Sequence, residues 1–304
     1  MDQVYSKASA LILAVAIGYW LKETERFSAD SPRFLSWLVL HITLPCVIIK
    51  SLSGISLSLQ LLKAAVWGTA VNSVLLLLAL LLFWKKDTQT RLAALFSLTT
   101  FNITNYIVPI LNPFTSPTAM AGIFAFNLPT SAFTYAVVPI CAGFLAPPQK
   151  VTGRVAMVLQ RFFHSTPTMV CIVMFLLAAM RISIPSSMLD VVKVFADANT
   201  FLAMLVVGSL VELPRSWRNS LCEVELIGIR LCAVCGMAAA LWWMAPVQPE
   251  LNRALIMALF APAASCCPIL ALDCGYQGKQ IAAVNSMYLL ISVGILSVLT
   301  CVMN

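Results

Sequence analysis

The chain has 304 residues, of which 61% are hydrophobic and 10% are charged, and its mean hydropathy is +0.92. Soluble domains are about 45–50% apolar and about 25% charged, so this composition excludes an ordinary soluble domain. The net charge of +7 comes from short basic clusters between apolar stretches rather than from one basic face, which argues against a nucleic-acid partner. We therefore predict one integral membrane domain in contact with the lipid bilayer.

Ten apolar stretches have roughly the length of a membrane-spanning helix, which takes about 17–25 residues. Five precede a polar linker that contains proline, at 146–165, and five follow it. The predicted spans are 4–21, 35–52, 64–84, 92–111, 119–145, 167–180, 188–211, 226–245, 254–272 and 281–302. The sequence thus predicts an all-α membrane protein with a five-helix unit at 1–145, a cytoplasmic linker, and a second five-helix unit at 166–304.

The distribution of positive charge predicts the orientation, because Lys and Arg are enriched in cytoplasmic connections. Of the sixteen Lys and Arg near the connections, twelve lie on one side of the predicted membrane and four on the other. The richer side includes the 146–165 linker. With ten spans, this distribution places both termini outside.

Two segments indicate an internal repeat, since 35–54 aligns with 189–208 at a constant offset of 154 residues. Units with an odd number of helices must lie in opposite orientations in the membrane. This arrangement is the inverted repeat found in many secondary carriers.

The fourth and ninth predicted spans occupy corresponding places in the two units, and both are interrupted near their middles. The polar and proline residues of these interruptions are Asn102, Thr104, Asn105 and Pro109 in the fourth span, and Pro262, Ser265 and Pro268 in the ninth. Proline removes a hydrogen-bond donor and frees a carbonyl, and such a break is stable in a membrane only inside protein or beside a wet cavity. Broken helices at equivalent positions therefore indicate a transport site.

The predicted orientation lets the second halves of both broken spans begin near the middle of the bilayer. Helix N-termini carry unpaired N–H groups and a partial positive charge, so two of them together favour an anion, and a carboxylate is the natural ligand. The alternative interpretation is two ordinary proline kinks, because proline is common in membrane helices.

Two residues of the seventh predicted span are further candidates. Asn199 aligns with Pro45 in the repeat, and its amide could bind a carboxylate or instead form an interhelical hydrogen bond. Asp197 is the candidate for coupling to protons or a cation, because an acid at that depth must be protonated or paired. Pairing with Lys193, one turn away, is the alternative.

Other polar residues are interpreted as structural. We expect His41 to be a packing residue, and Cys232 and Cys235 lack the further ligands that a metal or redox site needs. The charged residues expected to extend from helix ends to the interface are Lys50, Glu212, Glu225 and Arg230. The sequence predicts no catalytic residue, no metal site and no cofactor.

Four motifs follow one another at the spacing of a known family. They are 18–22 with 38–45, 95–109, 199–208 and 261–271. In these motifs the chain resembles the auxin efflux carrier family, which includes the PIN-type auxin exporters of plants and bacterial permeases for malate and related acids. The resemblance implies an inverted repeat with crossing broken helices, one scaffold domain, one mobile domain, and a carboxylate held at the crossover.

The resemblance also implies roles for single residues. Asn102 and Asn199 would contact the substrate, Leu44 and Ser265 would line the pocket, and Pro109 and Pro262 would set the crossover. The family has Asn-Thr-Gly and a second glycine in its fourth helix. Here Thr104 and Ile107 stand in place of those glycines, and their bulk bears on which substrate fits.

The long cytoplasmic loop of the plant exporters is absent, which favours the short bacterial type in the cytoplasmic (inner) membrane. The resemblance implies a homodimer as well. The leading hypothesis is a secondary carrier of a small organic carboxylate that works by rocking or by an elevator movement. Coupling to protons, to sodium or to neither stays open.

Three alternatives remain. A sodium- or proton-coupled symporter of the bile-acid type could use a related scaffold, and a channel or a non-transporting sensor could use the same one. A membrane-embedded enzyme is disfavoured, because two distant histidines leave little material for catalysis. No glycine-rich phosphate loop for ATP occurs in the sequence.

Overall fold

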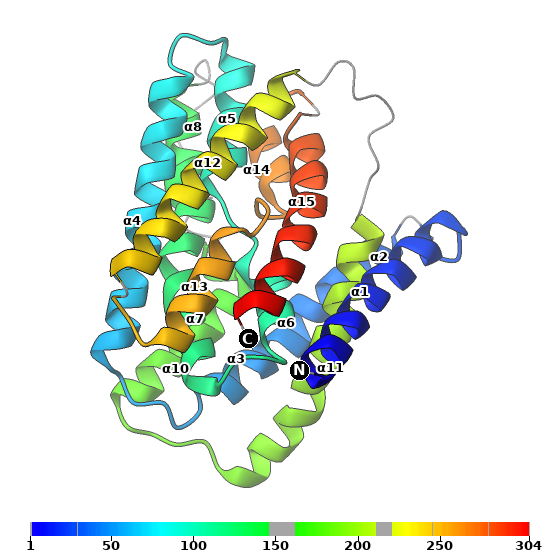
Figure 1. Ribbon diagram of the computed structural model, residues 1–304, viewed down its shortest axis with the longest axis vertical. Helices are drawn as coiled ribbons and strands as arrows, with labels where there is room; N and C mark the ends of the chain where they lie inside the picture. The colour runs from blue at the N-terminus through cyan, green and yellow to red at the C-terminus, as the bar shows by residue number, and fades with distance from the viewer. Residues whose placement is uncertain are drawn as a thin grey trace.

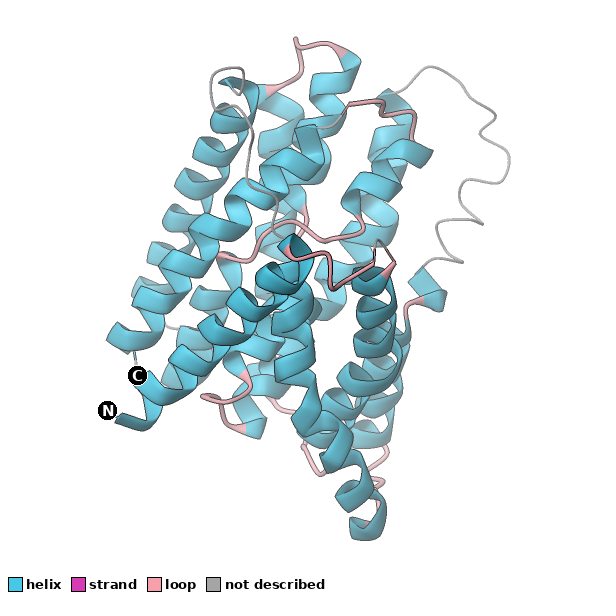
Figure 2. Ribbon diagram, turned by 90° about the vertical axis from the view of Figure 1, so that its right-hand side faces the viewer, coloured by secondary structure: helices cyan, strands magenta, loops and turns pink. Residues whose placement is uncertain are grey.

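The computed structural model describes residues 2–28, 30–145, 162–210, 221–244, 246–278 and 280–303. Every regular element in these ranges is a helix, so the all-α prediction is confirmed for the described part of the chain (Figure 2). Most of the 146–165 linker lies outside these ranges, as do Glu212 and six of the positive residues that predicted the orientation. Those six are Lys150, Arg154, Arg161, Arg215, Arg218 and Lys279. The predicted orientation is therefore untested.

The first half of the chain holds eleven described helical segments, and the second half holds six. The first are α1 (Asp2–Glu23), α2 (Ser31–Leu38), η1 (Val39–Thr43), α3 (Leu44–Leu52), α4 (Leu59–Leu82), α5 (Thr88–Thr99), η2 (Ile103–Ile107), α6 (Val108–Leu111), α7 (Pro117–Ala132), η3 (Phe133–Val137) and α8 (Val138–Leu145). The second are α10 (Thr166–Ala179), α11 (Ser186–Leu210), α12 (Leu221–Met244), α13 (Pro249–Leu259), α14 (Cys267–Asp273) and α15 (Gln280–Met303).

Six helices in the described ranges are long and apolar enough to cross a membrane. They are Ser31–Leu52, Leu59–Leu82, Pro117–Leu145, Ser186–Ser209, Leu221–Met244 and Gln280–Thr300. A seventh span exists if α5 is counted together with η2 and α6, which are bent from it by 45°. The chain is thus an integral membrane protein, whereas the predicted count of ten spans goes beyond what helix length and composition establish.

Three π-helical turns, η1, η2 and η3, each end two residues before a proline. Pro45, Pro109 and Pro139 are the second residues of α3, α6 and α8. Proline has no N–H to donate, and its ring crowds the carbonyl four residues earlier. A wider turn before the proline relieves this crowding and lets the helix continue.

Two helix starts in the connections, those of α5 and α7, are capped by short polar side chains. Asp87 accepts a hydrogen bond from the backbone N–H of Thr90 at 3.0 Å at the start of α5. The backbone and side-chain hydrogen bonds from Thr90 lower the pKa of the Asp87 carboxyl. Ser116 caps α7 and also binds the Glu250 carboxylate through its N–H and its hydroxyl, at 2.6 and 2.8 Å. This contact joins the beginnings of α7 and α13.

The helices pack as two groups. The smaller group consists of α1, α2, η1, α3, α10 and α11, in which α1 and α3 both pack along α11. The larger group contains α4 to α8 and α12 to α15, in which α4 packs along α7 and α12 packs on α13 and α15. In Figure 1, α1, α2 and α11 lie to the right of α4, α5, α8 and α12, and the start of α1 lies near the end of α15.

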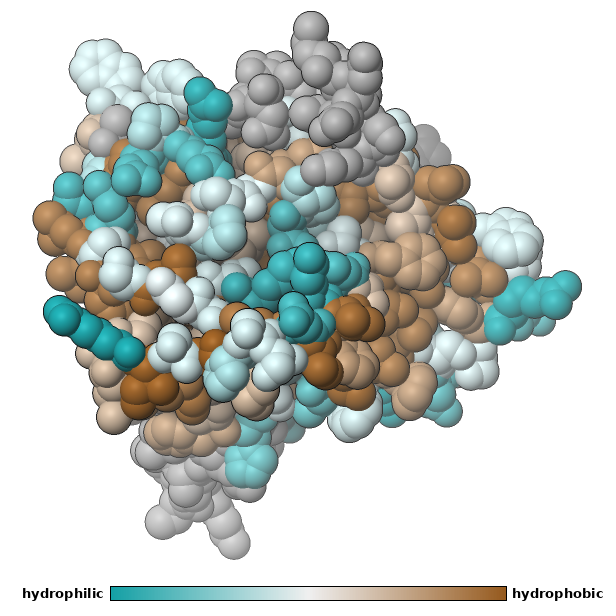
Figure 3. Space-filling model, turned by 90° about the horizontal axis from the view of Figure 1, so that it is seen from below, coloured by the Kyte–Doolittle hydropathy of each residue, from teal (hydrophilic) through white to brown (hydrophobic). Residues whose placement is uncertain are grey.

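The outer surface is rich in apolar side chains. Leu81, Val194 and Trp243 are at least 70% exposed although each lies within a helix. Viewed from below, hydrophilic side chains gather near the middle of one end of the molecule, and hydrophobic side chains border them (Figure 3). Such a surface is stable against lipid acyl chains but not against water.

Gly18 and Gly208 bring α1 and α11 into close contact. A Cβ on Gly18 would collide with the backbone carbonyl of Leu205, and a Cβ on Gly208 would collide with that of Val15. Small residues at such positions let two membrane helices approach closely and gain van der Waals contact. Both glycines belong to motifs that carry the family resemblance, and the structure shows that these motifs touch.

We expect Gly208→Ala to lower the free energy of unfolding by about 1–3 kcal/mol, because the added methyl group forces α1 away from α11. Gly236→Ala is the matched control, since a Cβ there would meet nothing within 4 Å. Thermal unfolding in detergent measures the effect. Equal melting temperatures for the two variants would show that the α1–α11 contact is not as tight as described.

Candidate functional site

The structure brings the two interrupted spans into contact. The backbone N–H of Asn102, in the break between α5 and η2, donates to the carbonyl of Pro262 at 2.8 Å. Pro262 lies in the break between α13 and α14. We call residues 100–102 and 260–266, where the two breaks meet, the crossover.

Side chains add a second layer of contacts at the crossover. The Asn102 amide donates to the Ser265 hydroxyl at 2.8 Å, and the Thr100 hydroxyl lies 3.0 Å from the Cys267 thiol. The backbone N–H of Ala264 donates to the Thr100 hydroxyl at 3.3 Å. Two of the backbone N–H groups at the breaks are therefore used by the protein itself.

A cavity of about 530 Å³ lies beside the crossover, between the two helix groups. Its wall from the larger group is polar and holds four asparagines together with several hydroxyl groups. The asparagines are Asn102, Asn105, Asn127 and Asn285, and the hydroxyl residues include Thr104, Ser131, Thr134, Ser265 and Ser286. The side-chain oxygens of Asn105 and Asn285 are buried without a hydrogen-bond partner in the described structure.

The opposite wall belongs mainly to the smaller group and is mostly apolar. It includes Val39 and Leu40 of the second span and Val206 of α11. Arg33 and His41 also lie on this wall. Among the described residues that line the cavity there is no Asp or Glu, and Arg33 and His41 are the basic residues.

The predicted site residues separate into two sets. Asn102, Thr104, Asn105, Ser265 and Pro268 line the cavity. Pro262 contributes its carbonyl to the crossover, and Pro109 is buried in α6, beyond the first break. These seven residues, distant in the sequence, lie together.

Asn199 and Leu44 do not line the cavity. Both are fully buried, at 0% exposure, behind the wall that η1 and α11 form. The Asn199 side-chain oxygen accepts a hydrogen bond from the Thr43 hydroxyl at 2.8 Å, which joins α11 to η1. In this conformation Asn199 serves the alternative role, an interhelical hydrogen bond.

Asp197 is paired, but not with Lys193. Its carboxylate lies 2.7 Å from the Lys50 ammonium, and both side chains are substantially exposed, at 56% and 39%. Lys50 lies at the end of α3, as expected, and in addition binds this acid of the neighbouring helix α11. Asp197 is not among the residues that line the cavity.

His41 does pack, with its ring stacked on Trp37 at 4.9 Å and its Nδ1 2.9 Å from the Trp37 carbonyl oxygen. It also lines the cavity. Spacing along the sequence could not reveal this second property, because the facing residues come from other helices.

Sequence reasoning missed Arg230. The interpretation as a helix-end residue is wrong, since its side chain is 1% exposed and its guanidinium reaches the crossover. A signal was available in the sequence. Arg230 lies well inside an apolar stretch, with no acidic residue three or four positions away on either side.

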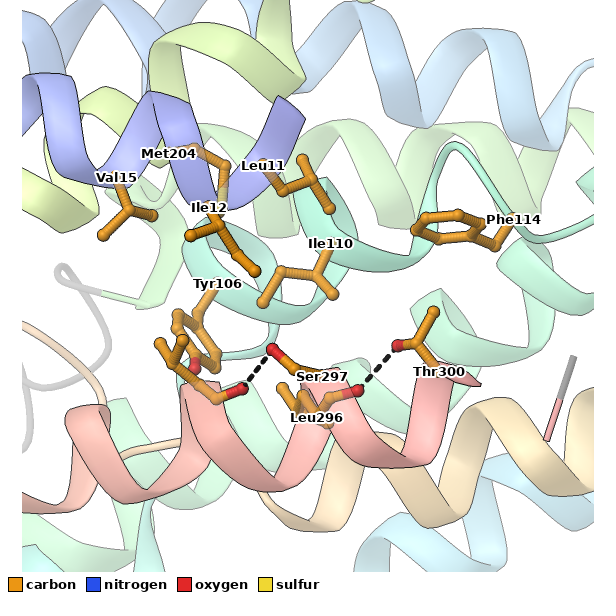
Figure 4. Close-up of a pocket in the computed structure, with 11 residues that line it drawn as sticks. Leu11, Ile12, Val15, Tyr106, Ile110, Phe114, Met204, Leu296, Ser297 and Thr300 are labelled. Carbon is orange, nitrogen blue, oxygen red and sulfur yellow. Dashed lines mark hydrogen bonds between the residues drawn. The ribbon is translucent and has the colours of Figure 1, made fainter. Parts of the chain in front are cut away.

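A second, small cavity of about 40 Å³ lies between the two groups elsewhere. Leu11, Ile12 and Met204 of the smaller group face Tyr106 and Ile110 of the larger group (Figure 4). The hydroxyls of Ser297 and Thr300 donate to carbonyls of their own helix, at 2.8 and 2.7 Å. This cavity offers a ligand few polar groups, so of these two cavities the large one beside the crossover is the candidate site.

Comparison with known proteins supports the resemblance in the first half of the chain. Residues 4–138 match the family described as membrane transport protein. A search of the curated proteins found no significant match. The matched region contains the first break with Asn102, Thr104 and Asn105, whereas the motifs at 199–208 and 261–271 lie outside it. Through residues 4–138, this chain is similar to the membrane transport protein family, the auxin efflux carrier family that its motifs resemble.

Proposed function

We propose that the protein is a secondary transporter of a small organic carboxylate, which binds in the large cavity beside the crossover. The observation that carries the proposal is the charge of the cavity. Its described lining combines uncharged amides and hydroxyls with Arg33 and His41 and has no carboxylate. An anion that enters finds hydrogen-bond donors and a positive field, whereas a cation finds no opposite charge.

The position of the cavity supports alternating access. It lies between the two helix groups, so a movement of one group against the other would change which end of the cavity is open. The hydrogen bonds from Asn112 to Thr200 and from Cys171 to Phe124 cross this boundary and are long, at 3.5 and 4.0 Å. The apolar contact in Figure 4 also crosses it. Weak and apolar contacts cost little to rearrange, as a rocking or elevator movement requires.

The composition of the groups supports ten spans in two inverted units. The smaller group takes the first two helices of each predicted unit, and the larger group takes the last three of each. The two broken spans meet at equivalent places. We propose on this basis a five-plus-five inverted repeat with both termini outside. The absent long loop favours the bacterial cytoplasmic membrane.

A bile-acid-type symporter, a channel and a sensor differ from this proposal in what they require. A symporter needs a coupling ion, a channel conducts without saturation, and a sensor binds without moving its ligand. Transport measurements therefore separate these functions, and we propose no enzymatic activity.

The function is tested by counterflow in proteoliposomes, guided by a thermal-shift panel of mono- and dicarboxylates, indole acids and bile acids. A ligand that binds the folded state raises the melting temperature by mass action. We expect stabilisation by one class of carboxylate and saturable counterflow of the same compound. Stabilisation by cations or neutral solutes alone, or single-channel currents, would refute a carboxylate carrier.

Asn102→Asp should weaken carboxylate binding by about tenfold or more. The substitution replaces the amide by a carboxylate of nearly equal volume and so places a negative charge in the cavity. Asn112→Asp is the matched control, since Asn112 does not line the cavity. Binding is measured by the ligand-dependent shift of the melting temperature. Equal losses in both variants would mean that the carboxylate does not bind beside Asn102.

Asn199→Ala should lower the free energy of unfolding by about 1–3 kcal/mol, since it leaves the buried Thr43 hydroxyl without its acceptor. We expect carboxylate affinity to stay close to that of the unchanged protein. Thermal unfolding with and without ligand measures both quantities. A stable variant that has lost binding would instead place Asn199 in the substrate site, as the family resemblance implies.

A further inference from the structure

Arg230 connects the two breaks from a third helix. Its guanidinium donates to the carbonyl oxygens of Thr100 at 2.7 Å and Ala261 at 2.9 Å, one in each break. It also donates to the carbonyls of Ser97 and Leu98 in the last turn of α5, the latter at 3.2 Å. One side chain of α12 thus gathers four backbone carbonyls.

These carbonyls belong to the places where α5 and α13 end. The last carbonyls of a helix have no partner in that helix and carry a partial negative charge. Two such ends side by side repel an anion and attract a cation. In carriers built from broken helices, carbonyls of this kind coordinate sodium.

The charge of Arg230 is not neutralised by an acid in the described structure. Its partners are carbonyl dipoles and the faces of Phe101 and Tyr288, whose ring centres lie 4.8 and 4.9 Å from the guanidinium carbon. Phe101 also lines the large cavity, next to Asn102. The positive charge therefore lies directly behind the candidate site.

We propose that Arg230 is the resident cation of the crossover. It holds the two breaks together through their carbonyls and occupies the place that a bound sodium ion would need, so carboxylate binding does not require sodium. This inference rests on the proposed function for its ligand, but the role of the guanidinium at the crossover can be tested without a ligand. Arg230 is a positioning residue, since it acts on the site through the backbone of both breaks.

The first experiment uses no substrate. Arg230→Ala should unfold at a lower temperature than the unchanged protein and should be partly restabilised by millimolar methylguanidinium or by sodium, relative to N-methylglucamine. The unchanged protein and the control Arg26→Ala, at an exposed position, should not respond. The melting temperature of Arg230→Lys should lie between those of Arg230→Ala and the unchanged protein, because an ammonium keeps the charge but lacks the planar five-donor geometry. Loss of stability without any response to added cations would overturn the proposal.

The second experiment compares indole-3-acetate with its neutral isostere indole-3-acetamide, in sodium-free buffer. In Arg230→Met, affinity for the acid should fall by about tenfold or more while affinity for the amide changes little, because the loss is electrostatic. A purely structural role would weaken both, and a requirement for sodium in the unchanged protein would also contradict the proposal. If neither compound nor any other carboxylate binds the unchanged protein, the proposed function fails, and the first experiment alone decides the role of Arg230.

Discussion

A broken helix inside a membrane protein must find partners for its backbone within the protein, since lipid offers none. Here the two breaks supply part of what they need to each other, through the hydrogen bond from the Asn102 N–H to the Pro262 carbonyl. Arg230 donates to one further carbonyl in each break, those of Thr100 and Ala261. The cavity and its amide-lined wall depend on this arrangement, because it fixes where the side chains of the breaks lie.

The cavity has two walls that differ in polarity. The larger group presents amides and hydroxyls, which can bind a carboxylate without carrying charge themselves. The smaller group presents an apolar wall with Arg33 and His41 on it. Within the smaller group, Gly18 and Gly208 bring α1 and α11 into close contact. The described hydrogen bonds between the groups, from Asn112 to Thr200 and from Cys171 to Phe124, are long, so the contact between the groups is mainly apolar packing.

The family similarity of residues 4–138 and the geometry of the site support each other, but they are separate findings. The family match covers residues 4–138 and includes one of the two breaks. The second break, the polar residues of α15 and Arg230 come from the rest of the chain. A fold hosts different functions, so the chemistry of the cavity has to carry the functional argument. Its lack of acidic residues in the described lining is the feature that points to an anion.

The sequence by itself determined the membrane character, the all-helical class and the places of both breaks, because apolar runs and prolines act locally. It also identified Asn102, Pro262 and Ser265 of the crossover. Only the tertiary structure decided which polar residues face the cavity. Asn199 turned out to bind Thr43, Asp197 to bind Lys50, and Arg230 to lie at the crossover. Partners from other helices settle these roles, and no spacing along one helix specifies them.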